Sequence, residues 1–147
     1  MKKILTKNEL AELGAQIGRI EEKTAAELRI VIRHKKHWSE RKLTARQVAE
    51  REFGTLGMSK TRNGTGILFF ILVSEKVFEL LADKGVLAAL PDDYWIKMAA
   101  GLSEHFSKSN FFHGLKTSLK EIGDVLEQRL PSVSVAGEDL PNDVIEE

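Results

Sequence analysis

The spacing of apolar residues changes along the chain between the period of a helix and the period of a strand. Apolar residues between positions 6 and 22 recur every three or four residues, which predicts an amphipathic helix capped by Thr6. Residues 28–33 alternate and are rich in β-branched side chains, which predicts a strand. The charges of Arg29 and Arg33 suggest that one face of this strand is less buried than the other.

Two further apolar segments predict a second helix and a pair of strands. Residues 44–57 have the helical period, and residues 66–73 form a continuous apolar run. In a right-handed βαβ unit the strands at 28–33 and 66–73 run parallel, and helices cover both faces of the second strand. Residues 76–82 are expected to return antiparallel after a turn at Ser74–Glu75.

The last third of the chain predicts helices followed by an acidic tail. One helix follows Asp92 and Asp93, which can cap it, and another extends from about residue 110 to 130. We therefore expect an α/β fold with three α/β/α layers, in which helices flank a small mixed sheet, within one domain at 1–131. Residues 132–147 contain five acids and no base, so we expect a flexible, solvated tail.

Composition narrows the functions that the sequence permits. The chain has no cysteine, which excludes disulfides and thiolate chemistry, and its 22 basic residues balance its 22 acidic ones. This balance leaves no global field that would attract nucleic acid. The longest apolar run is far shorter than the roughly 20 residues of a membrane-spanning helix, and the amino terminus has no secretory apolar region. We expect a cytoplasmic protein without nucleic-acid binding or membrane insertion.

The predicted topology brings several oxygen-bearing residues to one edge of the sheet. The returning antiparallel strand ends where the two parallel strands start, so Glu27, Asn63 and Asp83 are expected to converge. Asp92 and Asp93 can join them if the preceding connection folds back, although helix capping explains both acids equally well. Asn63 and Asp83 also fit ordinary turns. Because hard cations prefer oxygen ligands, the set predicts a divalent cation site for calcium or magnesium.

Other residues permit different functions. Arg62 beside Asp83 can bind a phosphate, which with a bound cation would give a metal-assisted acid phosphatase acting on phosphomonoesters, but no second base completes that chemistry. The basic segment 33–46 can dock a protein partner, although a solvated loop explains it more simply. His34 and His37 lie in this segment without a third ligand nearby, so we predict no zinc site.

An ordered set of short segments spans nearly the whole chain: residues 21–30, 53–64 with the apolar strand after them, 82–86, 94–95 and 140–143. Together they resemble the TPM domain family, in its short single-domain cytosolic branch. The resemblance implies a three-layer α/β/α domain that binds a divalent cation at its turn acids, here Asp83 with Glu27, Asp92 and Asp93. Members of the family have also been associated with acid phosphatase activity, photosystem repair and accessory roles at membrane receptors. Thr65–Gly66 depart from the family pattern, which has an apolar residue directly after the turn.

The leading hypothesis from the sequence is a cation-binding or accessory module. The phosphatase and the protein-interaction domain without a site are the two alternatives.

Overall fold

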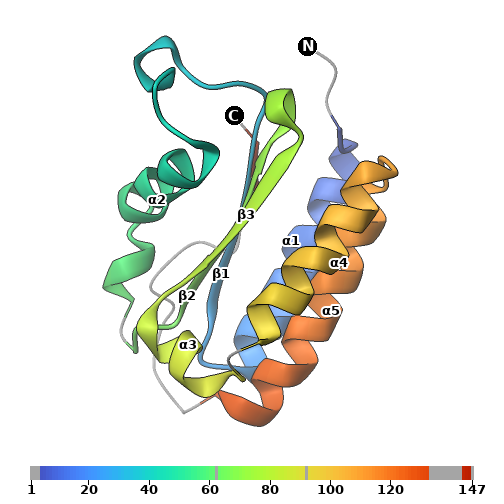
Figure 1. Ribbon diagram of the computed structural model, residues 1–147. Coiled ribbons are helices and arrows are strands. Elements are labelled where there is room, and N and C mark those ends of the chain that lie inside the picture. Colours follow the sequence, from blue (N-terminus) through green and yellow to red (C-terminus); the bar gives the residue numbers. More distant parts are fainter. Residues whose placement is uncertain (1–3, 62, 92, 133–143, 147) are drawn as a thin grey trace.

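The computed structural model describes residues 4–61, 63–91, 93–132 and 144–146. Its helices and strands are α1 (Lys7–Lys23), β1 (Glu27–Arg33), α2 (Ala45–Thr55), β2 (Gly66–Leu72), β3 (Val77–Ala82), α3 (Lys84–Ala89), α4 (Tyr94–Ser107), α5 (Phe111–Arg129) and β4 (Val144–Glu146). Short 3-10 helices are η1 (Trp38–Glu40), η2 (Met58–Lys60) and η3 (Val73–Glu75). The helix α2 lies on one face of the sheet, and α1, α4 and α5 lie on the other (Figure 1).

The sheet is mixed and has the strand order β3-β2-β1-β4. Strand β1 runs parallel to β2, with Glu27 opposite Gly66, and β2 runs antiparallel to β3, with Ile67 opposite Ala82. This is the predicted parallel unit followed by a returning strand. The α/β fold with a mixed sheet between helices is therefore confirmed.

The strand β2 is the centre of the packing because all seven of its residues are buried. Its side chains alternate between two apolar clusters, one on each face of the sheet. Residues Ile67, Phe69 and Ile71 pack with α1, α4 and α5, whereas Leu68, Phe70 and Leu72 pack with α2. A continuous apolar run is what a strand covered on both faces requires.

The strand β4 departs from the sequence prediction. Residues 144–146 pair parallel with Ile30–Ile32 of β1, so the expectation of a solvated tail is wrong for these three residues. Val144 and Ile145 join the clusters on opposite faces of the sheet, and they close an edge of β1 that would otherwise be open. The sequence does not predict this strand, because its two apolar residues, Val144 and Ile145, lie in a segment that is otherwise rich in acids. Residues 133–143 and 147 lie outside the described residues.

Gly66 begins β2 at a point where another backbone segment lies directly against it. A Cβ atom placed on Gly66 would lie 2.2 Å from the carbonyl oxygen of Met58, which belongs to η2. The backbone of η2 therefore crosses directly over the first residue of β2, and any side chain there would push it away. The Asn63–Gly64 turn, which joins η2 to β2, therefore lies at the start of β2. The pairing of β1 with β2 is regular from Gly66 onward.

We predict that Gly66→Ala destabilises the protein by about 1–3 kcal/mol, because the new methyl group meets a backbone atom that cannot move aside cheaply. Urea unfolding followed by circular dichroism measures the change. The matched control is Gly101→Ala in α4, where a Cβ meets nothing within 4 Å and alanine is expected to stabilise the helix by up to about 1 kcal/mol. Equal unfolding midpoints for the two variants would show that η2 does not rest on β2.

Candidate functional site

Asp83 and the Asn63–Gly64 turn meet at the edge of the sheet where β1 and β2 begin and β3 ends. The amide of Asp83 donates a hydrogen bond of 2.9 Å to the carbonyl of Gly66, and the amide of Gly85 donates one of 2.8 Å to the carbonyl of Gly64. A Cβ atom on Gly64 would lie 3.8 Å from Oδ2 of Asp83. The convergence of these two turns, expected from the topology, is therefore present.

Two glycines make this close approach possible. Gly64 has a φ of 66°, in the left-handed region that glycine adopts without a Cβ clash. A Cβ atom on Gly85 would lie 2.5 Å from the carbonyl oxygen of Asn63 and 2.6 Å from that of Gly64. Only glycine at position 85 lets the first turn of α3 come so near to these two carbonyls. The result is that the carbonyl oxygens of Asn63 and Gly64 lie against the backbone of Gly85, two residues after Asp83.

The carboxylate of Asp83 has one structural role at this edge. Asp83 is the N-cap residue of α3, and its Oδ1 accepts a hydrogen bond of 2.9 Å from the amide of Lys84. Within the described part of the chain, Oδ2 accepts no hydrogen bond and lies on the Gly64 side. Capping therefore explains one oxygen of the carboxylate and leaves the other available to a ligand.

Glu27 lies in the same cross-strand row but is not a direct neighbour of Asp83. It pairs with Gly66 from the β1 side, while Asp83 bonds to Gly66 from the β3 side, so β2 stands between the two acids. Two strand spacings separate the backbones by about 10 Å. The Met58 carbonyl, which covers Gly66, also occupies this interval. Glu27 can reach a ligand at Asp83 only over that distance.

Asp93, one of the two acids predicted at the start of α4, is separate from this group in its interactions. Asp93 occupies the N-cap position of α4, as predicted, but makes no side-chain capping bond. It forms an exposed ion pair of 2.9 Å with Lys97, whose hydrogen bond and positive charge lower the pKa of Asp93. Asp92 and Arg62 lie outside the described residues.

The donor set at the edge has one nearby carboxylate and several neutral oxygens. Across residues 4–61, 63–91, 93–132 and 144–146, no group of three or more histidine, cysteine, aspartate or glutamate side chains is arranged to hold a metal ion. The chemistry that the edge permits is weak binding of a hard cation, for which amide and carbonyl oxygens are suitable ligands.

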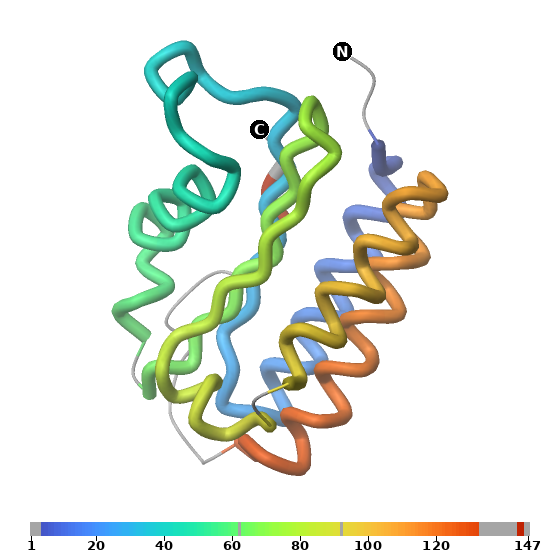
Figure 2. Tube along the Cα trace, in the orientation of Figure 1, coloured from blue at the N-terminus to red at the C-terminus, as the bar shows by residue number. Residues whose placement is uncertain are grey.

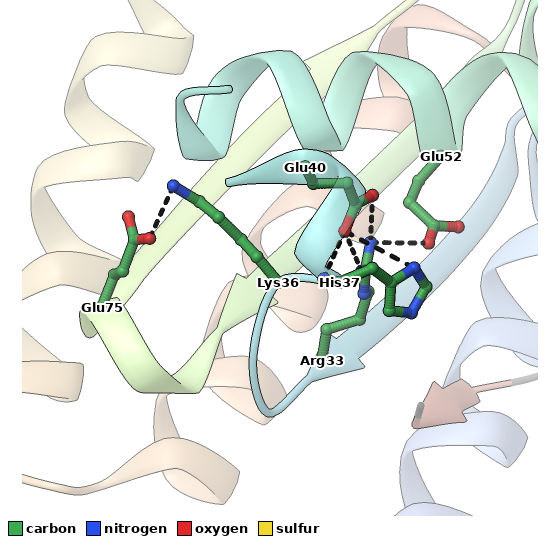
Figure 3. Close-up of polar contacts among 6 residues, drawn as sticks. All are labelled: Arg33, Lys36, His37, Glu40, Glu52 and Glu75. Atoms are coloured by element: carbon green, nitrogen blue, oxygen red, sulfur yellow. Dashed lines mark hydrogen bonds and ion pairs between the residues drawn. The ribbon is translucent and has the colours of Figure 1, made fainter. Parts of the chain in front are cut away.

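A second polar cluster, buried on the α2 face, was missed by the sequence analysis (Figure 3). The Arg33 side chain is 2% exposed and donates to both carboxylate oxygens of Glu40, with a further contact of 3.3 Å to Glu52. The expectation that Arg29 and Arg33 mark a less buried face is wrong, since both residues are buried. Paired carboxylates from η1 and α2 make the burial of Arg33 tolerable.

This cluster anchors the basic segment between β1 and α2. Oε1 of Glu40 also accepts a hydrogen bond of 2.7 Å from the amide of His37. The neighbouring Lys36 forms an ion pair of 2.8 Å with Glu75 of η3, in the connection between β2 and β3 (Figure 3). Part of the positive charge in segment 33–46 is therefore neutralised internally. The segment is held by buried ion pairs, which differs from the freely solvated loop suggested by its composition.

The fold and the edge define the class of protein: a three-layer α/β domain with a mixed sheet, in which the turn before β2 meets the start of α3. The family model for the TPM domain matches residues 1–125. The chain belongs to the TPM domain family, as the ordered segments indicated. No curated protein matches it. In the part that the structure describes, no helix combines the length and apolar character needed to cross a bilayer.

Solved structures with the same fold come from three bacteria. The BA42 protein of the psychrophile Bizionia argentinensis is 24% identical with a TM-score of 0.86, covering 100% of this chain and 98% of its own. The N-terminal domain of a protein from P. gingivalis is 16% identical with a TM-score of 0.71, covering 86% of this chain and 79% of its own. The N-terminal domain of cg2496 from Corynebacterium glutamicum is 9% identical with a TM-score of 0.64, covering 91% and 80%. At these identities the likeness establishes the fold.

The buried ion cluster predicts a specific loss of stability in acid. Hydrogen bonding from Arg33 lowers the pKa of Glu40 from 4.5 to about 2. A carboxylate whose pKa is lowered by folding stabilises the folded state above the unfolded pKa, and this contribution is lost as the pH falls through the folded pKa. We predict that Glu40 contributes on the order of 3 kcal/mol at pH 6, which disappears between about pH 4.5 and pH 2.

The variant Glu40→Gln separates this effect from general acid unfolding. It is expected to lower the unfolding free energy at pH 6 by about 3 kcal/mol or more, because Arg33 stays buried with fewer partners, and to flatten the decline below pH 4.5. Urea unfolding at several pH values measures both changes. Glu104→Gln, in an exposed pair with Lys108, is the control and should leave the pH profile unchanged. Parallel pH profiles for wild type and Glu40→Gln would contradict the prediction.

Proposed function

We propose that this TPM domain is a binding module that takes up a divalent cation, calcium or magnesium, at the edge formed by Asp83 and the Asn63–Gly64 turn. The observation that carries the proposal is the meeting of these two turns, in which a carboxylate with one available oxygen lies beside Gly64, and the carbonyls of Asn63 and Gly64 lie against Gly85, two residues after Asp83. Oxygen atoms from a carboxylate, an amide and the backbone are the ligand types of hard cations. The protein would act as an accessory to a partner protein in the cytoplasm.

The residues of the edge differ in their suitability as ligands. Asp83 supplies the charge, and exposed Asn63 and the Gly64 carbonyl supply neutral oxygens next to it. The carbonyl of Gly64 already accepts one hydrogen bond from Gly85, which leaves one lone pair for an ion. Glu27 is an outer member, because β2 separates it from Asp83. One carboxylate supports a dissociation constant of about 10⁻⁴–10⁻³ M, as in weak extracellular calcium modules.

The acids at the start of α4 are less suited to the ion. Asp93 would have to exchange its ion pair with Lys97 for the cation. Its contribution is therefore a long-range attraction that falls off with salt. Asp92 lies outside the described residues, and its role as a ligand is supported by the sequence alone. Asp83 remains the residue on which binding is expected to depend.

Metal-assisted hydrolysis of phosphomonoesters is supported by family membership alone. A phosphatase needs a nucleophile or metal-bound water and a group that handles protons close to the bound phosphate. Asp83 is the one edge acid adjacent to the Asn63–Gly64 turn, and its Oδ1 is engaged in capping α3. Incubation with p-nitrophenyl phosphate and magnesium tests this function directly. Turnover that is abolished by Asp83→Asn would replace the binding-module proposal with an enzymatic one.

The cation site predicts localised amide shifts on titration with calcium or magnesium chloride. In ¹H–¹⁵N spectra the largest saturable changes are expected at Gly64, Asp83 and Gly85. Asp83→Asn should weaken binding at least about fivefold, because it removes the nearby negative charge while asparagine still caps α3. Asp93→Asn is the matched control, and it should change the affinity less than twofold. Saturable shifts confined to other acids, or an unchanged affinity in Asp83→Asn, would contradict the proposal.

A further inference from the structure

A cavity lies at the opposite end of the sheet from Asp83. Its volume is about 560 Å³, and it opens between the turn that joins β2 to β3 and the junction of α4 with α5. Figure 2 shows both of these connections at the same end of the molecule, whereas α3 lies at the other end. Pockets that bind small molecules usually have volumes of about 300–1,000 Å³. The cavity is therefore large enough for a small organic ligand.

The walls of the cavity are aromatic and aliphatic. Phe78 and Phe106 pack edge to face with their ring centres 5.1 Å apart, and Phe111 follows Phe106 at 5.2 Å. These three rings pack against the large core cluster but are only partly buried themselves. Val73 and Ile71 continue the apolar wall along β2. The core is thus open here, and covering this surface with an apolar group would release free energy.

Among the described residues that line the cavity, one lysine carries an unpaired positive charge. The exposed side chain of Lys76 lines the cavity, and within the described part of the chain it forms no ion pair. Its neighbour across the same turn, Glu75, is already paired with Lys36. Ser103 and Ser109 also line the cavity, and their hydroxyl groups make no hydrogen bond to the described residues. An ammonium group and free hydroxyls above an apolar wall are complementary to an acid with an apolar body.

Backbone geometry supports a special role for this rim. Among the residues that the structure describes, Lys76 with a φ of 53° and Ser109 with a φ of 59° are the two non-glycine residues in the left-handed region. Both line the same cavity, although they belong to different connections. Such conformations cost of order 1–3 kcal/mol and tend to cluster at binding sites. Here they place the polar residues of two separate turns around one opening.

We propose that this cavity binds a medium-chain carboxylic acid, with its hydrocarbon tail against the three phenylalanines and its carboxylate at Lys76. A single ammonium group matches the single charge of a carboxylate. The site is independent of the proposed cation site, because the seven residues of β2 separate the two ends by about 20 Å. Loss of one site would therefore leave the other intact.

Decanoate is the probe, and decanol is the uncharged comparison of the same length. Titration of each into the ¹³C-methyl-labelled full chain should shift the methyl groups of Ile71, Val73 and Val77. Intermolecular NOEs from the alkyl chain to these methyls are expected to fix the site. Decanoate should bind about three- to tenfold more tightly than decanol, because only decanoate can pair with Lys76. Shifts and NOEs located elsewhere, or no preference for decanoate, would overturn the proposal.

The variant Lys76→Asn removes the charge at a backbone conformation that asparagine tolerates. It should abolish the preference for decanoate while decanol still binds, which also shows that the cavity is intact. Lys42→Asn, an exposed lysine in the loop before α2, is the matched control and should keep the preference. A preference that survives Lys76→Asn would overturn the proposal. Self-association through the cavity would also overturn the proposal. It would be detected as a sedimentation coefficient that rises with protein concentration, together with shifts of the cavity methyl groups that depend on protein concentration in the same way.

Discussion

The complete burial of β2 is the constraint on which the rest of the structure depends. The six apolar side chains from Ile67 to Leu72 need cover on both faces of the sheet, and the backbone groups of β2 need strand partners on both sides, because all seven residues are buried. The strands β1 and β3 supply these partners in a fixed register. A slip of one residue would exchange the two faces of β2 and disrupt both apolar clusters. The register therefore determines which residues meet at each end of the sheet.

The two ends of β2 differ in chemistry because different kinds of turn complete them. At its start, glycines at 64, 66 and 85 let backbone segments approach one another closely, so polar atoms collect beside Asp83. At its end, Lys76 and Ser109 lie in two different connections that border an apolar wall, and a cavity opens there. A single buried strand thus separates a polar edge from an apolar opening. The Arg33 cluster fixes the loop on the α2 face at the end of the sheet where β2 ends, because Arg33 lies opposite Leu72.

Features governed by local sequence could be predicted, whereas features governed by distant pairing could not. The capping box of Thr6 and Glu9 and the apolar run of β2 identify their elements from adjacent residues alone. The directions of the strands were enough to predict that the turn at Asn63 lies near Asp83. That β2 separates Glu27 from Asp83 became clear only from the pairing register of the strands. The helix α3 is only six residues long and was read as a connection. The burial of Arg33 depends on its ion pairs with Glu40 and Glu52, which lie in other elements, and the sequence around Arg33 does not indicate these pairs.

We infer that the register of β2 holds the polar edge as rigidly as the core. Native-state hydrogen exchange tests it at two amides, those of Asp83 and Gly85, which donate to the carbonyls of Gly66 and Gly64. We predict that both amides exchange with opening free energies close to those of the central β2 amides, and that these energies fall together as urea is added. Exchange at Asp83 and Gly85 at the rate of an exposed loop would contradict the claim.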